Sequence, residues 1–182
     1  KIMDMLFISS TFQDMQHERD AIRNLVIPRL NKEAQEYGQA VSVCDLRWGI
    51  DTSELDSNTA ALKVLDVCLD EIENSESPMI VILGERYGWI PPKNLIASVA
   101  EKKKLQLEDL QLSATELEIE YGTKIHKNHM LFYFRELDSA LIERRYLAEN
   151  KERHEKMTNL KSRIMRMTYG TVHKYKVHFD ED

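Results

Sequence analysis

The chain has 182 residues, of which 42% are hydrophobic and 31% are charged, a composition typical of one globular domain with its own core. Its formal net charge of −6 argues against a general nucleic-acid-binding protein, because such a protein needs a basic face to neutralise phosphates. No stretch approaches the roughly 20 apolar residues that cross a bilayer, so we expect neither nucleic acid nor membrane as a partner.

The chain begins at Lys1 rather than Met and enters an apolar run within a few residues, without a signal peptide. We therefore expect an excised fragment of a larger, cytoplasmic protein. Cys44 and Cys68 lie in apolar surroundings with no His or Cys at ligand spacing, which predicts buried thiols in a reducing compartment and no metal site.

Apolar runs predict five β-strands, with helical patterns between them. The strands are expected at residues 5–8, 40–44, 79–83, 130–134 and 175–179. Between the first two, Pro28 is expected to kink or divide a helix and Gly38 to end it. Later helices are expected on the stripe Ala61, Leu65, Cys68, Leu69 and Ile72, near residues 95–99, from residue 113, and within 137–167.

The order β-α-β-α-β-(α)-α-β-α-β predicts an α/β fold with a five-stranded, mostly parallel, doubly wound sheet of flavodoxin-like type. We expect a single domain over residues 1–182, with a core at 4–136 and a helical extension and last strand at 137–179. Such sheets bind ligands outside the carboxyl ends of their strands. That edge would gather the segments 9–11, 45–49 and 84–89.

Two of these segments carry polar side chains with two interpretations each. The hydroxyls of Ser9 and Ser10 can cap the next helix or bind a ligand. Arg47 can bind a carboxylate or phosphate in a bidentate manner, and Trp48 can stack on a planar ring. The alternative is an internal Asp–Arg network with Trp48 packed on the core.

The third segment, Glu85-Arg86-Tyr87 between two glycines, is a further candidate for substrate binding. The glycines permit close approach of the backbone to a ligand, and Tyr87 and Trp89 can either cradle a base or buttress the loop.

The helix from Ser113 carries Glu116, Glu118 and Glu120. Glu116 is expected to complete a capping box with Ser113. Glu118 flanks the expected buried stripe of Leu117, Tyr121 and Ile125, which makes it the carboxylate best placed for a half-buried site; a solvated face is the alternative.

The runs FISSTFQDMQHERDAIRNLVIPRL, DLRWG, CLDEIENS, VILGERYGWIPP, SATELEIEYG and MLFYFRE together resemble a TIR-like family of N-terminal domains in STAND proteins. Members stand before a NACHT-type NTPase, often with WD40 or TPR repeats, as in telomerase-associated, nephrocystin-type and bacterial antiphage proteins. The resemblance covers residues 4–136 and implies that the partners are the rest of such a parent protein and other TIR-like domains.

Enzymatic TIR domains hydrolyse NAD at the nicotinamide–ribose bond with one glutamate, so the resemblance implies an NAD+ nucleosidase that acts on oligomerisation in innate or antiviral defence. NAD would be its substrate, and no cofactor is implied. Glu118 in LEIEYG matches the family's glutamate, with Glu116 as second choice, although the long insertion at residues 93–112 separates Trp89 from Glu118 in sequence. The alternatives are a non-catalytic self-association module and a nucleoside-processing domain of similar fold.

Overall fold

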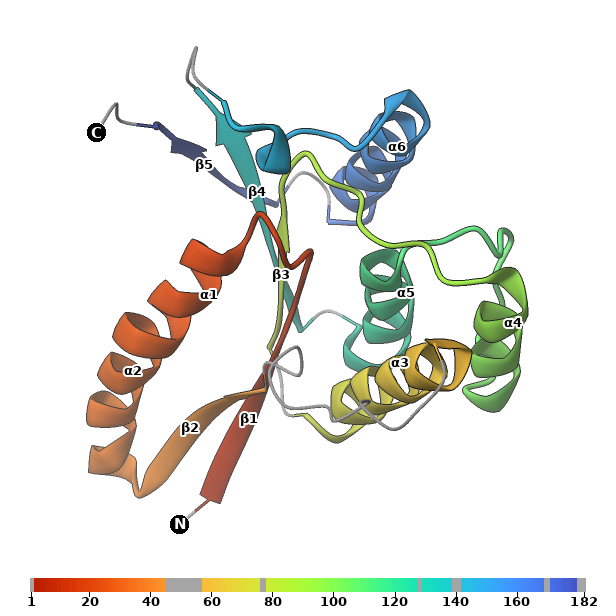
Figure 1. Ribbon diagram of the computed structural model, residues 1–182. Helices are drawn as coiled ribbons and strands as arrows, with labels where there is room; N and C mark the ends of the chain where they lie inside the picture. The colour runs from red at the N-terminus through yellow and green to blue at the C-terminus, as the bar shows by residue number, and fades with distance from the viewer. Residues whose placement is uncertain are drawn as a thin grey trace.

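The computed structural model describes residues 2–44, 57–75, 78–127, 129–138, 142–168 and 171–179. Five strands form one parallel sheet in the order β2-β1-β3-β4-β5, which confirms the predicted doubly wound α/β fold (Figure 1). The strands are β1 (Ile2–Ser10), β2 (Gln39–Cys44), β3 (Met79–Leu83), β4 (Met130–Leu137) and β5 (His173–Val177).

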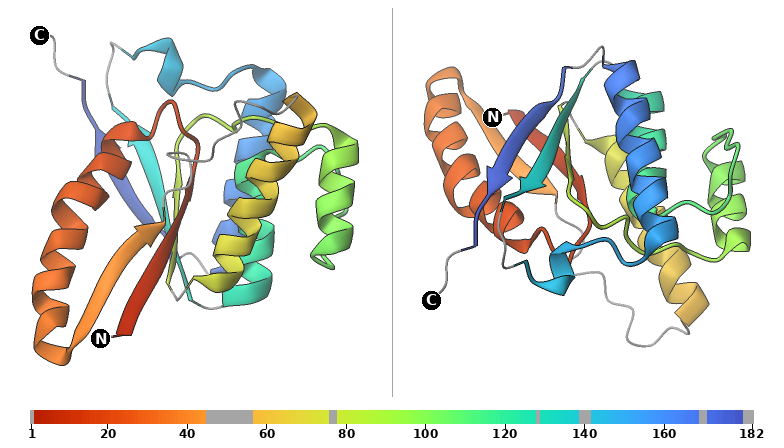
Figure 2. Two further views of the ribbon diagram at one scale, coloured as in Figure 1. Left: turned by 60° about the horizontal axis from the view of Figure 1, so that its bottom comes forward. Right: turned by 90° about the horizontal axis from the view of Figure 1, so that it is seen from above.

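The helices cover the two faces of the sheet unequally (Figure 2). On one face lies a single helical run, and on the other lie α3, α5 and α6, with α4 packed outside α3. The helices are α1 (Gln16–Ala21), α2 (Ile27–Ala34), α3 (Ser57–Asn74), α4 (Lys93–Lys102), α5 (Ala114–His126) and α6 (Lys151–Met167). None of the helices in the described segments is both long and apolar enough to span a bilayer.

The helical run between β1 and β2 shows the effect of Pro28. A π-helical stretch, Ile22–Val26, separates α1 from α2, and Pro28 lies in the first turn of α2. Proline lacks an N–H and clashes with the carbonyl four residues earlier, so the regular ladder is interrupted just before it. Gly38 then ends the run at a φ of 69°, as predicted.

Strand β1 changes partner along its length. Residues 2–7 pair with β2, and residues 8–10 pair with β3. Since strand side chains alternate, Phe7 and Ser9 face the α3/α5 side while Ile8 and Ser10 face α1. The end of β1 therefore places one buried hydroxyl on each side of the sheet.

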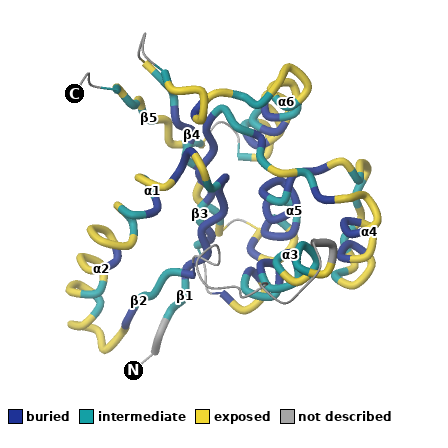
Figure 3. The backbone as a smooth tube through the Cα atoms, in the orientation of Figure 1, coloured by how far each residue is buried: buried dark blue, intermediate teal, exposed yellow. Residues whose placement is uncertain are grey.

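The main core lies between the sheet and the helices α3, α5 and α6 (Figure 3). It includes Cys44 and Cys68, which are both buried, as predicted. The stripe of α5 differs from expectation at its end, because Leu117 and Tyr121 are buried but Ile125 is 36% exposed. His126, one position further, is the buried residue there and contacts the carbonyl of Ile72 at 2.7 Å.

Candidate functional site

A cleft opens at the carboxyl edge of the sheet, between the loops that follow β1 and β3. These strands are neighbours from which the chain leaves in opposite directions, toward β2 and toward β4, so the cleft lies at the topological switch point where doubly wound sheets bind ligands. Its volume is about 540 Å³. It is lined by Thr11, Phe12, Gln13, Val64, Leu65, Cys68, Arg86, Gly88, Trp89, Ala114, Thr115, Glu118, Glu149 and Arg153.

Glu118 lies in this cleft near the start of α5 and is only 4% exposed. The fully buried hydroxyl of Ser9 donates a hydrogen bond of 2.6 Å to its Oε2 atom. The two residues are far apart in sequence, but the alternation of β1 turns Ser9 toward α5. The structure thus brings together two of the predicted site residues, and burial with a hydroxyl donor restricts the orientation of the carboxylate.

The insertion that separates Trp89 from Glu118 in sequence does not separate them in space. Residues 93–102 form α4, and the chain returns so that the Ala114 amide donates to the Trp89 carbonyl at 2.9 Å. Trp89 and Glu118 consequently line the same cleft. The indole is 50% exposed and is therefore accessible to a planar ligand.

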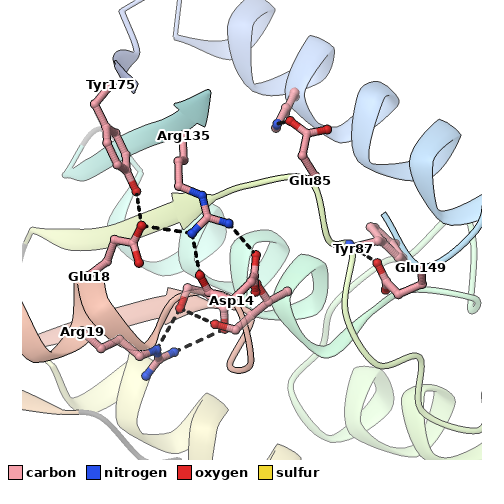
Figure 4. Close-up of polar contacts among 11 residues, drawn as sticks. Asp14, Glu18, Arg19, Glu85, Tyr87, Arg135, Glu149 and Tyr175 are labelled. Carbon is pink, nitrogen blue, oxygen red and sulfur yellow. Dashed lines mark hydrogen bonds and ion pairs between the residues drawn. The ribbon is translucent and has the colours of Figure 1, made fainter. Parts of the chain in front are cut away.

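The mouth of the cleft carries two cations, Arg86 and Arg153, and a second carboxylate, Glu149. Glu149 accepts hydrogen bonds from the amides of Tyr87 and Gly88, each at 2.9 Å (Figure 4 shows the contact with Tyr87). Arg153 approaches the same carboxylate, with its Nε atom 3.7 Å from Oε2. This site therefore holds one anionic group, the Glu149 carboxylate, in a cleft whose apolar wall is formed by Val64, Leu65 and Cys68 of α3.

Several predicted site residues have other roles. Ser10 accepts a hydrogen bond from Arg19 at 2.9 Å on the opposite face, and α1 has no side-chain cap, so the interpretation of Ser9 and Ser10 as caps of this helix is wrong. The Ser9 hydroxyl donates to Glu118, and the Ser10 hydroxyl donates to the carbonyl of Thr11. Glu85 turns toward Lys161 of α6 at 4.0 Å, outside the cleft. Arg47 and Trp48 lie outside the described residues.

Tyr87 is fully buried and buttresses the start of α5 instead of facing the cleft. Its hydroxyl donates to Glu116 and accepts from the Ser113 amide at 3.2 Å. Burial raises the pKa of this phenol well above its ordinary value, and the Glu116 carboxylate raises it further, so the proton stays in place. Ser113 accepts from the Glu116 amide as expected, but Tyr87 binds the groups that would close the capping box.

Glu116, the second choice as catalytic residue, is engaged in this structural network. It also pairs with Arg163 of α6 at 2.9 Å and does not line the cleft. The geometry therefore distinguishes the two glutamates that the sequence left as alternatives, with Glu118 in the cleft and Glu116 beside it.

A buried ionic cluster lies near the cleft, where Arg135 of β4 meets Asp14 and Glu18, which follow β1 (Figure 4). Arg135 is 2% exposed and pairs with Asp14 at 2.9 Å and Glu18 at 3.0 Å, while Tyr175 donates to Glu18 at 3.1 Å. Gly84 makes room for it, because a Cβ atom there would stand 2.7 Å from Arg135 Nη2. The cluster joins α1 and the loop before it to β4 and β5 at this edge.

Sequence reasoning missed Gln13, Thr115, Glu149 and Arg153 in the cleft and Arg135 beside it. Glu149 and Arg153 stand in a charged segment without a motif, where nothing local separates them from solvated neighbours. For Arg135 a signal existed, since an Arg that directly follows the apolar run Met130–Phe134 is placed at a buried strand end. Within the described residues, no three His, Cys, Asp or Glu side chains are grouped to hold a metal ion.

Comparison with protein families assigns the class of this α/β domain. Residues 5–182 match the family described as "Domain of unknown function (DUF4062)", and the chain belongs to that family. No solved structure matches.

Relatives are large proteins of which this chain spans a small part. It is 46% identical to telomerase protein component 1 of Mus musculus over 87 residues, which is 48% of this chain and 3% of that protein. It is 30% identical to a TPR repeat-containing protein of Dictyostelium discoideum over 182 residues, 90% of this chain and 11% of that protein. It is 40% identical to NACHT and WD repeat domain-containing protein 2 of Mus musculus over 90 residues, covering 47% and 5%.

Proposed function

We propose that this chain is a TIR-like effector domain of a NACHT-containing STAND protein and that it hydrolyses NAD at the nicotinamide–ribose bond when the parent protein assembles. The observation that carries the proposal is the buried Glu118, held by Ser9 in a cleft of about 540 Å³ at the switch point of the sheet. Relatives named for NACHT domains and WD repeats support the parent architecture.

The chemistry suits a site with a single carboxylate. The C1′–N1 bond breaks with its electron pair passing to the pyridinium nitrogen, so nicotinamide leaves as a neutral ring without a general acid. A water oxygen then bonds to C1′ and one water proton is released. Glu118 would stabilise the developing positive charge on the ribose and orient its hydroxyls, because a buried carboxylate acts strongly on charge that develops nearby.

The lining of the cleft fits the rest of such a substrate. Trp89 offers an exposed aromatic face for a planar ring, and Arg86 and Arg153 offer positive charge for phosphates. Thr11, Gln13 and Thr115 add hydrogen-bonding groups for ribose hydroxyls.

The test is NAD turnover by the 182-residue chain fused to a domain that forces oligomerisation. Glu118→Gln keeps the shape of the side chain but removes its charge, and we expect turnover to fall by at least about 100-fold. Glu101→Gln on the exposed side of α4 serves as the control and should retain full turnover. Glu116→Gln should retain most of it. Absence of NAD loss in every assembly state would overturn the proposal.

A non-catalytic role in self-association is the second candidate. It is favoured by the apolar side chains Leu25, Val26 and Leu30, which are 69%, 44% and 37% exposed on the helical run beside β1. This role predicts that Leu25→Lys weakens assembly of the chain in sedimentation experiments, with Arg29→Lys as a control. Assembly without any NAD loss would favour this candidate over the enzyme.

A further inference from the structure

Glu149 is bound in the way that a phosphate is bound by a peptide loop. Its two carboxylate oxygens accept from two consecutive amides, Tyr87 and Gly88, each at 2.9 Å. Consecutive amides that converge on one acceptor form an anion-binding concavity. Gly88 adopts a φ of 99°, which non-glycine residues rarely adopt, so the loop is shaped to present these amides together.

The surroundings of the carboxylate point to a larger anion than Glu149 itself. The Nε atom of Arg153 is buried and has no hydrogen-bond partner, and it stands 3.7 Å from Glu149, too far for a hydrogen bond. A buried guanidinium N–H group without a partner is costly, and a tetrahedral anion with more oxygens than a carboxylate would reach it. Arg86 lines the same cleft and adds positive charge.

Glu149 and Glu118 balance these two arginines in charge. While Glu149 is bound to the two amides, its carboxylate occupies the position that a phosphate would take. The two negative groups would repel each other strongly in a partly buried site. Glu149 comes from the segment between β4 and α6, whereas the amides come from the loop after β3. The side chain can therefore leave while the amides stay.

We propose that Glu149 is an internal competitor that occupies the phosphate subsite of the cleft, so that the domain binds a nucleotide diphosphate only when Glu149 withdraws. This inference rests on the proposed function for the identity of the ligand. It adds a means of regulation: a shift of residues 142–150 in the parent protein would open the subsite.

The experiment measures binding of ADP-ribose and of inorganic pyrophosphate to the 182-residue chain by calorimetry at fixed ionic strength. Glu149→Ala should bind both about tenfold more tightly than the unaltered chain, as expected when a competing state holds about nine-tenths of the population. Glu152→Ala, an exposed carboxylate on α6, controls for the general loss of negative charge and should leave binding unchanged. Equal or weaker binding by Glu149→Ala would overturn the proposal.

A double variant keeps the test specific. Glu149→Ala with Arg153→Ala should lose the gain, because the anion would lose its guanidinium partner; retention of the gain would place the anion elsewhere and overturn the proposal. NAD turnover is recorded separately. Tighter ADP-ribose binding by Glu149→Ala without NAD turnover would support the internal competitor and contradict NAD hydrolysis. NAD turnover without tighter binding by this variant would support NAD hydrolysis and contradict the internal competitor.

Discussion

At the scale of single residues, Arg135 shows how much one side chain can organise at the edge of the sheet. It donates to the carboxylates of Asp14 and Glu18 and to the backbone carbonyl of Asp14, all from a position that is almost fully buried. A buried ion pair contributes little net stability over an apolar pair of the same shape, but removing one member leaves an uncompensated charge.

We therefore expect Arg135→Met to lower the free energy of unfolding by about 3–5 kcal/mol, because the buried Asp14 carboxyl and Glu18 would both lose the cation that pairs with them. Urea denaturation measures the loss. Arg145→Met, where the arginine is half exposed, pairs with Glu143 and lies over the Tyr146 ring, should cost less than about 0.5 kcal/mol. A loss below about 1 kcal/mol for Arg135→Met would contradict the role given to this cluster.

Lys161 is a second residue with an unusual environment. It lies over the Phe134 ring, with Glu85 at 4.0 Å and Arg135 nearby. Burial lowers the pKa of its ammonium group from the ordinary 10.5. The unfolded chain therefore holds this proton more tightly than the folded chain does, and stability rises with pH between the folded pKa and 10.5.

Lys161→Met should consequently raise the free energy of unfolding at pH 7, by up to about 1 kcal/mol, because it removes a charge that is costly to bury. The advantage over the unaltered chain should shrink as the pH rises through 10.5, because the lysine becomes neutral in both states only above that value. Thermal unfolding across that pH range measures it, with the exposed Lys151→Met on the same helix as the control. If the stability gained by Lys161→Met grew with pH instead, the inferred downward shift of the Lys161 pKa would be contradicted.

At the scale of elements, the start of α5 explains why Glu118 is held in a defined position. The loop after β3 reaches this helix through Tyr87, which binds both the Ser113 amide and the Glu116 carboxylate. Arg163 of α6 holds Glu116 from the other side. The first turn of α5, and with it the cleft, is thus fixed by two other elements.

Tyr87→Phe should lower the free energy of unfolding by about 1–3 kcal/mol, because it leaves a buried amide and a buried carboxylate without their shared partner. Chemical denaturation provides the measurement. Tyr37→Phe makes the same change at a position that is 79% exposed and should have no effect. Equal stability of the two variants would mean that Tyr87 contributes only its ring.

At the scale of the whole molecule, helices cover one face of the sheet more completely than the other. The face toward α3, α5 and α6 is covered by a continuous core, whereas the opposite face carries one helical run and an apolar groove of about 470 Å³. Right-handed crossovers explain this, since every connection from β2 onward moves in one direction along the sheet and so lies on one face.

Features of the fold and the site could be predicted from the sequence where the residues that form them are close together in the chain. The strand Met79–Leu83 and the helix cap at Ser113 follow from contiguous residues, and both were predicted correctly. The strand β1 was predicted too short, because Ser9 and Ser10 look like a strand end until β3 supplies their ladder partners. Glu118 could be favoured from its place on the helix, but its hydrogen bond to Ser9 could not.

The sequence by itself determined the α/β class, the five-stranded doubly wound sheet and the edge where the cleft lies, because hydrophobic periodicity and chain order are local properties and right-handed crossovers leave few topologies. Only the tertiary structure decided which glutamate lines the cleft, that Tyr87 supports α5, and that Glu149 binds the amides after β3. These contacts join residues that lie 29 to 109 positions apart, and no local pattern encodes such a pairing.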